Sequence, residues 1–196
     1  MLGIAATITA VIAVIIGSIW FKQRQEDAWR AFAAGRGMVF TPGGFFGQPS
    51  MRGEHQGLPL SLEVEVRGSG KHRHLYTLVV VAIPAALPSG LALSEEGFFS
   101  GVSRFFGSQD IQVGDAELDA AAMIKGTDEE AVRQLLRQAP ARQAALKVVR
   151  YGNHSRVEEG AVKLLRYGLS TDSTVLVQMM DEAVAAARGL AAGAAR

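Results

Sequence analysis

The chain has 196 residues, which is the length of one ordinary domain with some additional sequence. Its 20 lysines and arginines nearly balance its 19 aspartates and glutamates. It therefore lacks the basic charge of a dedicated nucleic-acid-binding protein, and we expect no nucleic-acid partner. It contains no cysteine, which excludes disulfides, thiolate metal ligands and a thiol nucleophile.

The first 21 residues carry no charged side chain. A helix of that length spans about 30 Å, the thickness of the hydrocarbon core of a bilayer. Trp20 and Phe21 stand where interfacial aromatic residues are common, and Lys22 and Arg24 follow directly. A cleaved signal peptide is the alternative, but no basic residue precedes the apolar run and no small-residue cleavage site precedes Trp20. Residues 1–21 are therefore predicted to be an uncleaved, single-span membrane anchor.

The residues that flank this anchor predict its orientation. Lys22, Arg24, Arg30 and Arg36 follow it, whereas only the α-amino group stands before it. Positively charged flanks favour the cytoplasmic side. We therefore expect a single-pass protein of the inner (cytoplasmic) membrane, with its soluble domain on the cytoplasmic side.

One face of the predicted span consists of small residues at intervals of four, which are Ala5, Thr9, Ala13 and Gly17. Small side chains at this spacing allow a second membrane helix to approach closely, which predicts self-association or a partner helix. The alternative is that small residues are simply frequent in membrane helices.

The soluble part begins with a predicted juxtamembrane helix over residues 22–36. Trp29, Phe32 and Ala33 form one apolar stripe at helical spacing, and Gly35 is expected to end the helix. Alternating apolar and polar residues, or short apolar runs, then predict strands over residues 50–55, 58–67, 72–83, 91–93, 111–113 and 118–125.

Helices dominate the sequence that follows. Thr127 and Glu130 form a capping-box pattern that predicts a helix start. Pro140 separates this helix from a second one, which is expected over residues 141–149.

The C-terminal part contains a predicted hairpin and a last helix. A two-residue turn at 159–160 joins expected strands over residues 155–158 and 161–167. Asp172 is the expected N-cap of the final helix. The tail over residues 189–196 is rich in alanine and glycine and is expected to fray.

This order of elements favours the α+β class. We expect an N-terminal single transmembrane helix, followed over residues 37–188 by an antiparallel sheet with helices packed on one face. The phrases KVVRYG at 147–152 and KLLRYG at 163–168 read alike. The first is expected to end a helix and the second a strand, so they are not interpreted as a structural repeat.

Several weakly specific features occur together between residues 87 and 187. They are the turn Gly114-Asp115-x-x-Leu118-Asp119, the phrase Ile124-x-Gly126, a helix with the pair Leu135-Leu136, and the Glu159-Gly160 hairpin. In this pattern about half of the chain resembles uncharacterised bacterial membrane-anchored domains of unknown function. The resemblance implies a bacterial source and an α+β domain on a membrane tether. It carries no catalytic residues.

Motifs of the common enzyme classes are missing from the sequence. Gly70-Lys71 lacks the upstream glycine of a Walker A loop, and there is no dinucleotide fingerprint, nucleophile elbow or H-E-x-x-H pattern. We therefore expect no cofactor and favour a non-enzymatic function.

Four basic side chains gather before the longest predicted strand, and they are Lys71, His72, Arg73 and His74. They can bind phosphate or the anionic headgroup of a lipid, which a membrane-tethered domain meets often. The two histidines, two apart in a strand, would face one side and can hold a metal together with His55 or Glu54. The simpler alternative is a solvated strand end.

Asp115 and Asp119 bracket another predicted turn. Paired carboxylates can act as acid and base, but no histidine, lysine or nucleophile accompanies them in the sequence. More often, an aspartate after a glycine accepts hydrogen bonds from turn amides.

The most distinctive feature is a predicted short amphipathic helix with five apolar residues at helical spacing, which are Phe98, Phe99, Val102, Phe105 and Phe106. Such a helix packs on the core or binds a partner.

Three functions follow from these observations. The first is a membrane-tethered, non-enzymatic interaction or scaffold module that uses the small-residue face and the phenylalanine-rich helix. The second is a lipid- or small-ligand-binding module with the basic turn over residues 71–74 at the mouth of a cavity between sheet and helices. The third is a hydrolase that uses the histidines with Asp115 and Asp119.

Overall fold

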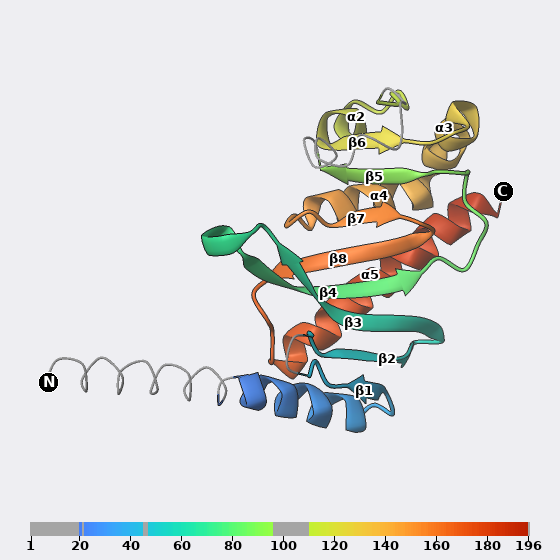
Figure 1. The fold of residues 1–196 in the computed structure, drawn as a ribbon. Helices are drawn as coiled ribbons and strands as arrows, with labels where there is room; N and C mark the ends of the chain where they lie inside the picture. Colours follow the sequence, from blue (N-terminus) through green and yellow to red (C-terminus); the bar gives the residue numbers. More distant parts are fainter. Residues whose placement is uncertain (1–19, 21, 45–46, 96–109, 196) are drawn as a thin grey trace, which may run out of the picture.

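The structure is a computed structural model that describes residues 20, 22–44, 47–95 and 110–195. Its described part is an eight-stranded antiparallel sheet with helices, which confirms the α+β class (Figure 1). Among the described residues, no helix is both long and apolar enough to cross a bilayer. Apart from Trp20, the anchor predicted over residues 1–21 lies outside the described residues.

A helix over residues 22–34 precedes the sheet, as the apolar stripe predicted. Trp29 is fully buried on it, together with Phe32. The helix does not end on Gly35. Gly37 adopts the left-handed conformation (φ 65°), and the amide of Met38 donates to the carbonyl of Ala33 at 2.9 Å. This is a Schellman ending, in which the left-handed residue is the one without a Cβ.

The sheet contains the strands β1 (Val39–Thr41), β2 (Ser50–His55), β3 (Leu58–Arg67), β4 (His74–Ala82), β5 (Ala92–Glu95), β6 (Ala122–Lys125), β7 (Arg156–Glu158) and β8 (Ala161–Tyr167). Their spatial order is β1-β2-β3-β4-β8-β7-β5-β6. The predicted bounds of β2, β3 and β8 are confirmed. In contrast, β4 starts at His74 and not at residue 72, because residues 70–72 form the short 3-10 helix η1 (Gly70–His72).

The other helices are α2 (Ala116–Ala121), α3 (Glu129–Arg137), α4 (Ala139–Arg150) and α5 (Ser173–Ala194). The strand predicted over residues 118–125 is wrong in its first half, which belongs to α2. The carboxylate of Asp115 accepts a hydrogen bond from the amide of Leu118 at 3.0 Å, and this N-cap starts a helix in a segment rich in alanine.

The N-cap of α3 is Asp128, not Thr127. The Asp128 carboxylate accepts a hydrogen bond from the amide of Ala131 at 3.0 Å. Thr127 remains in the preceding loop because its amide donates to the carbonyl of Ser89 at 2.8 Å. Asp172 caps α5 as predicted, accepting from the amide of Thr174 at 2.8 Å.

One face of the sheet is apolar and is covered by helices. Leu62, Val79 and Leu164 lie side by side on β3, β4 and β8 and are fully or almost fully buried. The same core contains side chains from the 22–34 helix and from α2 to α5. Figure 1 shows α4 and α5 behind the sheet, with α5 running beneath several strands. This arrangement agrees with helices packed on one face.

The tail predicted to fray over residues 189–196 instead continues α5 through Ala194. Leu190 is fully buried. A Cβ added at Gly193 would lie 2.5 Å from the Cβ of Ala141, and one added at Gly189 would lie 2.8 Å from the Cβ of Ala144. The small residues thus let α5 pack closely on α4, and the prediction of fraying underestimated this packing.

The opposite face of the sheet carries a network of charged side chains. Arg156 on β7 donates to Glu65 at 3.1 Å and to Glu158 at 2.6 Å, and Lys163 on β8 donates to Glu158 at 2.8 Å. Burial alone would raise the pKa of the Glu158 carboxyl, but hydrogen bonds from Lys163 and Arg156 outweigh it and lower that pKa. Burial likewise opposes the charge of Lys163, yet its bonds to Glu158 and Glu159 raise its pKa.

Candidate functional site

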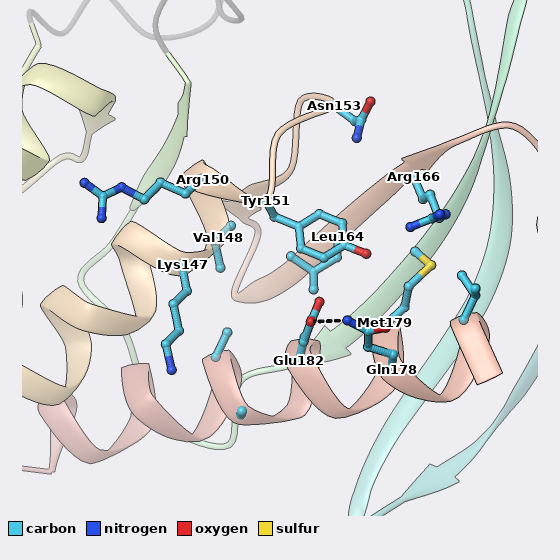
Figure 2. Close-up of a pocket in the computed structure, with 13 residues that line it drawn as sticks. Lys147, Val148, Arg150, Tyr151, Asn153, Leu164, Arg166, Gln178, Met179 and Glu182 are labelled. Carbon is cyan, nitrogen blue, oxygen red and sulfur yellow. Dashed lines mark hydrogen bonds between the residues drawn. The ribbon is translucent and has the colours of Figure 1, made fainter.

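A cavity of about 620 Å³ opens between α4, α5 and β8 on the helix-covered side of the sheet (Figure 2). Its origin is the spacing of the two helices. Gly189 and Gly193 allow close contact near the start of α4, whereas larger side chains separate the helices near its end. The cavity is lined by Lys147, Val148, Arg150, Tyr151, Asn153, Leu164, Arg166, Val175, Gln178, Met179, Glu182, Ala185 and Ala186.

The apolar part of the lining belongs to the hydrophobic core. Val148, Leu164 and Met179 are buried and form a wall that is shared with the core of the domain. A volume of this size lies within the range of ligand pockets, which usually combine an apolar lining with a few polar groups. The cavity can therefore hold the apolar body of a small molecule.

The polar groups of the cavity give it a positive balance. Lys147 and Arg166 contribute two cations against the single carboxylate of Glu182, whereas the guanidinium of Arg150 forms an ion pair with Glu117, which does not line the cavity. Figure 2 shows Lys147 and Arg166 on opposite sides of Tyr151 and Glu182. The Glu182 carboxylate accepts a hydrogen bond from Gln178 at 2.9 Å. An anionic group is the complement of this arrangement.

Tyr151 keeps its proton in this setting. Burial, reinforced by the negative charge of Glu182, raises the pKa of its hydroxyl, although the charge and hydrogen bond of Arg166 act in the opposite direction. The hydroxyl therefore remains a neutral hydrogen-bond donor at physiological pH. Beside Arg166 it can donate to an oxygen of a bound carboxylate, sulfonate or phosphate.

The described residues that line the cavity lack the nucleophile–histidine pairs of the common hydrolases. They include no serine, threonine, cysteine or histidine. A nucleophile activated by a neighbouring base is the usual requirement for hydrolysis through a covalent intermediate. The residue types present favour binding.

The basic turn lies away from the cavity lining. Lys71, His72, Arg73 and His74 are all exposed, at the tip of the β3–β4 hairpin. The Nδ1 atom of His74 lies 3.3 Å from the hydroxyl of Tyr167 on β8. The structure therefore does not place this turn at the mouth of the cavity, since none of its residues lines it.

The metal site considered from the sequence is not assembled. His72 belongs to η1 and not to the strand of His74. His55 pairs with the first residue of β3, whereas His74 pairs with the last, about 30 Å away at the rise of a strand. His55 instead contacts the carboxylate of Asp181 on α5 at 2.7 Å. Among the described residues there is no group of three potential metal ligands.

Asp115 and Asp119 both serve the backbone. Asp115 caps α2 and forms an ion pair with Arg142 at 3.3 Å. Asp119 accepts hydrogen bonds from the amides of Val113 at 2.8 Å and Gly114 at 3.0 Å. The two carboxylates thus hold one turn together, as the alternative interpretation of the sequence expected.

Two predicted surfaces lie outside the described residues. These are the amphipathic helix with Phe98, Phe99, Val102, Phe105 and Phe106, and the small-residue face with Ala5, Thr9, Ala13 and Gly17. The interaction functions assigned to them stay predictions.

Sequence reasoning missed the cavity, although one signal was present. The similar phrases at 147–152 and 163–168 end α4 and β8, respectively, so they are indeed a helix end and a strand end. Both contribute to the same cavity, the first with Lys147 and Tyr151 and the second with Arg166. The likeness of the two phrases marks residues of the cavity, but it does not by itself indicate that they meet in space.

Comparison of the chain with protein-family models, with curated proteins and with solved structures found no match. The resemblance to membrane-anchored bacterial domains therefore stays a prediction, and the functional argument depends on the cavity itself.

Proposed function

We propose that this protein is a membrane-tethered, non-enzymatic binding module whose ligand is a small organic anion with an apolar part. The observation that carries the proposal is the cavity between α4, α5 and β8. It joins an apolar wall to two cations, Lys147 and Arg166, and to the protonated hydroxyl of Tyr151. An apolar body would fill the cavity, and an acidic head would lie between these donors.

The tether is part of the proposal and comes from the sequence. The uncharged residues 1–21 followed by Lys22 and Arg24 favour a span with the domain on the cytoplasmic side. A domain held at the inner membrane would bind its ligand close to the bilayer surface. The interaction or scaffold function expected first from the sequence is compatible with this proposal, since the residues that line the cavity are not those of the predicted interaction surfaces.

The proposal is tested by calorimetric titration of the full chain in phosphatidylcholine nanodiscs. The probe is naphthalene-1-sulfonate, and naphthalene-1-methanol is its uncharged analogue. Saturable binding of the sulfonate alone is expected. The substitution Arg166→Gln should weaken it about tenfold, the effect of removing one charged hydrogen-bond donor.

Two controls make the titration specific. Empty nanodiscs measure partition of the probe into lipid, and Arg137→Gln removes an exposed arginine of α3 that does not line the cavity. Equal binding of the sulfonate and the alcohol would contradict an anionic ligand. An equal loss of affinity for the sulfonate in Arg166→Gln and Arg137→Gln would indicate that the probe binds outside the cavity.

A further inference from the structure

One end of the domain brings together two segments that are far apart in the sequence, the tip of the β3–β4 hairpin and the start of the 22–34 helix. The connection between β8 and α5 joins them. At one end of this connection, the ring of Tyr167 lies 5.7 Å from that of His74 and 5.6 Å from that of Tyr76. At its other end, Leu169 and Thr171 line a hollow together with Trp20 and Arg24.

This connection is held firmly on both sides. The hydroxyl of Thr77 on β4 donates to the carbonyl of Gly168 at 2.9 Å and accepts from the amide of Ser170 at 2.8 Å. The indole of Trp29 donates to the carbonyl of Ser170 at 2.8 Å. The hairpin and the N-terminal helix are therefore fixed relative to one another. Figure 1 shows the hairpin tip and the beginning of this helix on the same side of the domain.

The side chains at this end are basic and aromatic. Lys71, His72 and Arg73 are exposed at the hairpin tip, and no acidic residue occurs between positions 65 and 95. The side chains of Trp20 and Tyr167 are 61% and 62% exposed. Cations beside amphipathic aromatic rings are the composition of protein surfaces that lie among lipid headgroups.

The cations at the start of the helix continue this surface. The guanidinium of Arg24 lies 4.9 Å from the ring centre of Trp20, and the ammonium of Lys22 donates to the carbonyl of Gly44 at 2.6 Å. Three of the acidic residues close to this end are engaged within the protein, and Glu26 on the 22–34 helix is a fourth acidic residue there. Glu65 binds Arg67, Asp27 binds Arg30, and Asp172 caps α5.

The sequence that precedes Trp20 indicates that this end of the domain faces a membrane. The 19 residues before Trp20 are uncharged and predominantly apolar, and they join the domain at this end. From this placement we infer that the end formed by Trp20, Arg24, Lys71, Arg73 and Tyr167 is a membrane-docking surface for anionic phospholipid headgroups. The inference uses the membrane tether of the proposed function but not its cavity. It assigns the domain a defined orientation, with the hairpin tip against the bilayer.

The absence of cysteine allows a direct test with single labels on the full chain. A nitrobenzoxadiazole fluorophore is placed at Ser69→Cys in the exposed hairpin tip, or at Gln134→Cys on the exposed side of α3 as the matched control. Figure 1 shows α3 at the opposite side of the domain from the tip. The protein is reconstituted in vesicles of phosphatidylcholine, with or without phosphatidylglycerol. Quenching by a lipid that carries a nitroxide near its headgroup is then measured.

The label at position 69 should be quenched in vesicles that contain phosphatidylglycerol, and the label at position 134 should not. Lys71→Ser with Arg73→Ser should reduce the equilibrium constant for docking about fivefold for each cation removed, and with it the quenching at position 69. Equal quenching at both positions, or equal quenching at position 69 without phosphatidylglycerol, would overturn the inference. Co-sedimentation of the same samples separates the two proposals, since protein that fails to stay with the vesicles lacks the tether. Titration of the cavity reports on the ligand independently.

Discussion

Replacing Leu190 with alanine tests whether the end of α5 belongs to the folded core. The side chain is fully buried in the last turns of a helix that the sequence alone predicts to fray. Substitution of a buried leucine by alanine costs about 2–5 kcal/mol, and the cost is highest where the surrounding structure cannot collapse. Gly189 and Gly193 already hold α5 in close contact with α4, so we expect about 3–5 kcal/mol here.

Thermal unfolding of the full chain in detergent, followed by circular dichroism, measures this effect. In a chain of this length each kcal/mol lowers Tm by about 2–4 °C, so Leu190→Ala should lower it by about 6–20 °C. Val39→Ala is the control, because the side chain of Val39 is 70% exposed and its loss should change Tm little. A change in Leu190→Ala no larger than in this control would refute the packing of residues 189–194 on α4.

Two further predictions concern the ion pair on the open face and the N-terminal helix. In the folded state the pKa of the Glu158 carboxyl lies below its ordinary value of 4.5. The ionised carboxylate therefore stabilises the fold fully above about pH 4.5, and this contribution is lost as the pH falls through the lowered pKa. The raised pKa of Lys163 contributes stability below its ordinary 10.5, which is lost as pH rises through the raised value. Glu158→Gln should therefore lower Tm at neutral pH and flatten its decline in acid, whereas parallel curves of Tm against pH for the two proteins would contradict this. Trp29→Phe removes the donor to the carbonyl of Ser170 and should cost about 1–3 kcal/mol in denaturant unfolding, an effect absent from Trp20→Phe at an exposed position.

Local patterns were sufficient to predict several elements of the fold. The bounds of β2 and β3 follow from alternating side chains and from the turn between them, where Gln56 and Gly57 both have positive φ. Asp172 predicted the start of α5 because an N-cap acts within one helical turn. These signals depend on residues close together in the chain.

Other elements depend on contacts that local patterns do not contain. A short apolar run suggested a strand from residue 118, but the cap at Asp115 and the helix propensity of the alanine-rich segment form α2. The prediction that the chain frays after Arg188 depended on the low helix propensity of glycine. In the structure, Gly189 and Gly193 lie where α5 contacts α4, and a larger side chain at either position would clash with α4. The long-range strand order, with β8 between β4 and β7, likewise has no local signal.

The candidate site was the least predictable part. The histidines, the paired aspartates and the basic turn were singled out by residue type. The structure separates the histidines, uses Asp115 as the N-cap of α2, and uses Asp119 to accept hydrogen bonds from turn amides. The cavity is assembled from α4, β8 and α5. Its polar residues lie far apart in the sequence and come together only because α4 and α5 pack on the same face of the sheet.

The central claim is that the cavity between α4, α5 and β8 binds an organic anion. The most direct test is a matched pair of tryptophan substitutions on one helix. Ala185 is exposed and lines the cavity, whereas Ala192 is exposed on α5 and does not line it. The affinity of the full chain in nanodiscs for naphthalene-1-sulfonate should be lost in Ala185→Trp and unchanged in Ala192→Trp, with similar Tm values for both. Undiminished affinity in Ala185→Trp would contradict binding in this cavity.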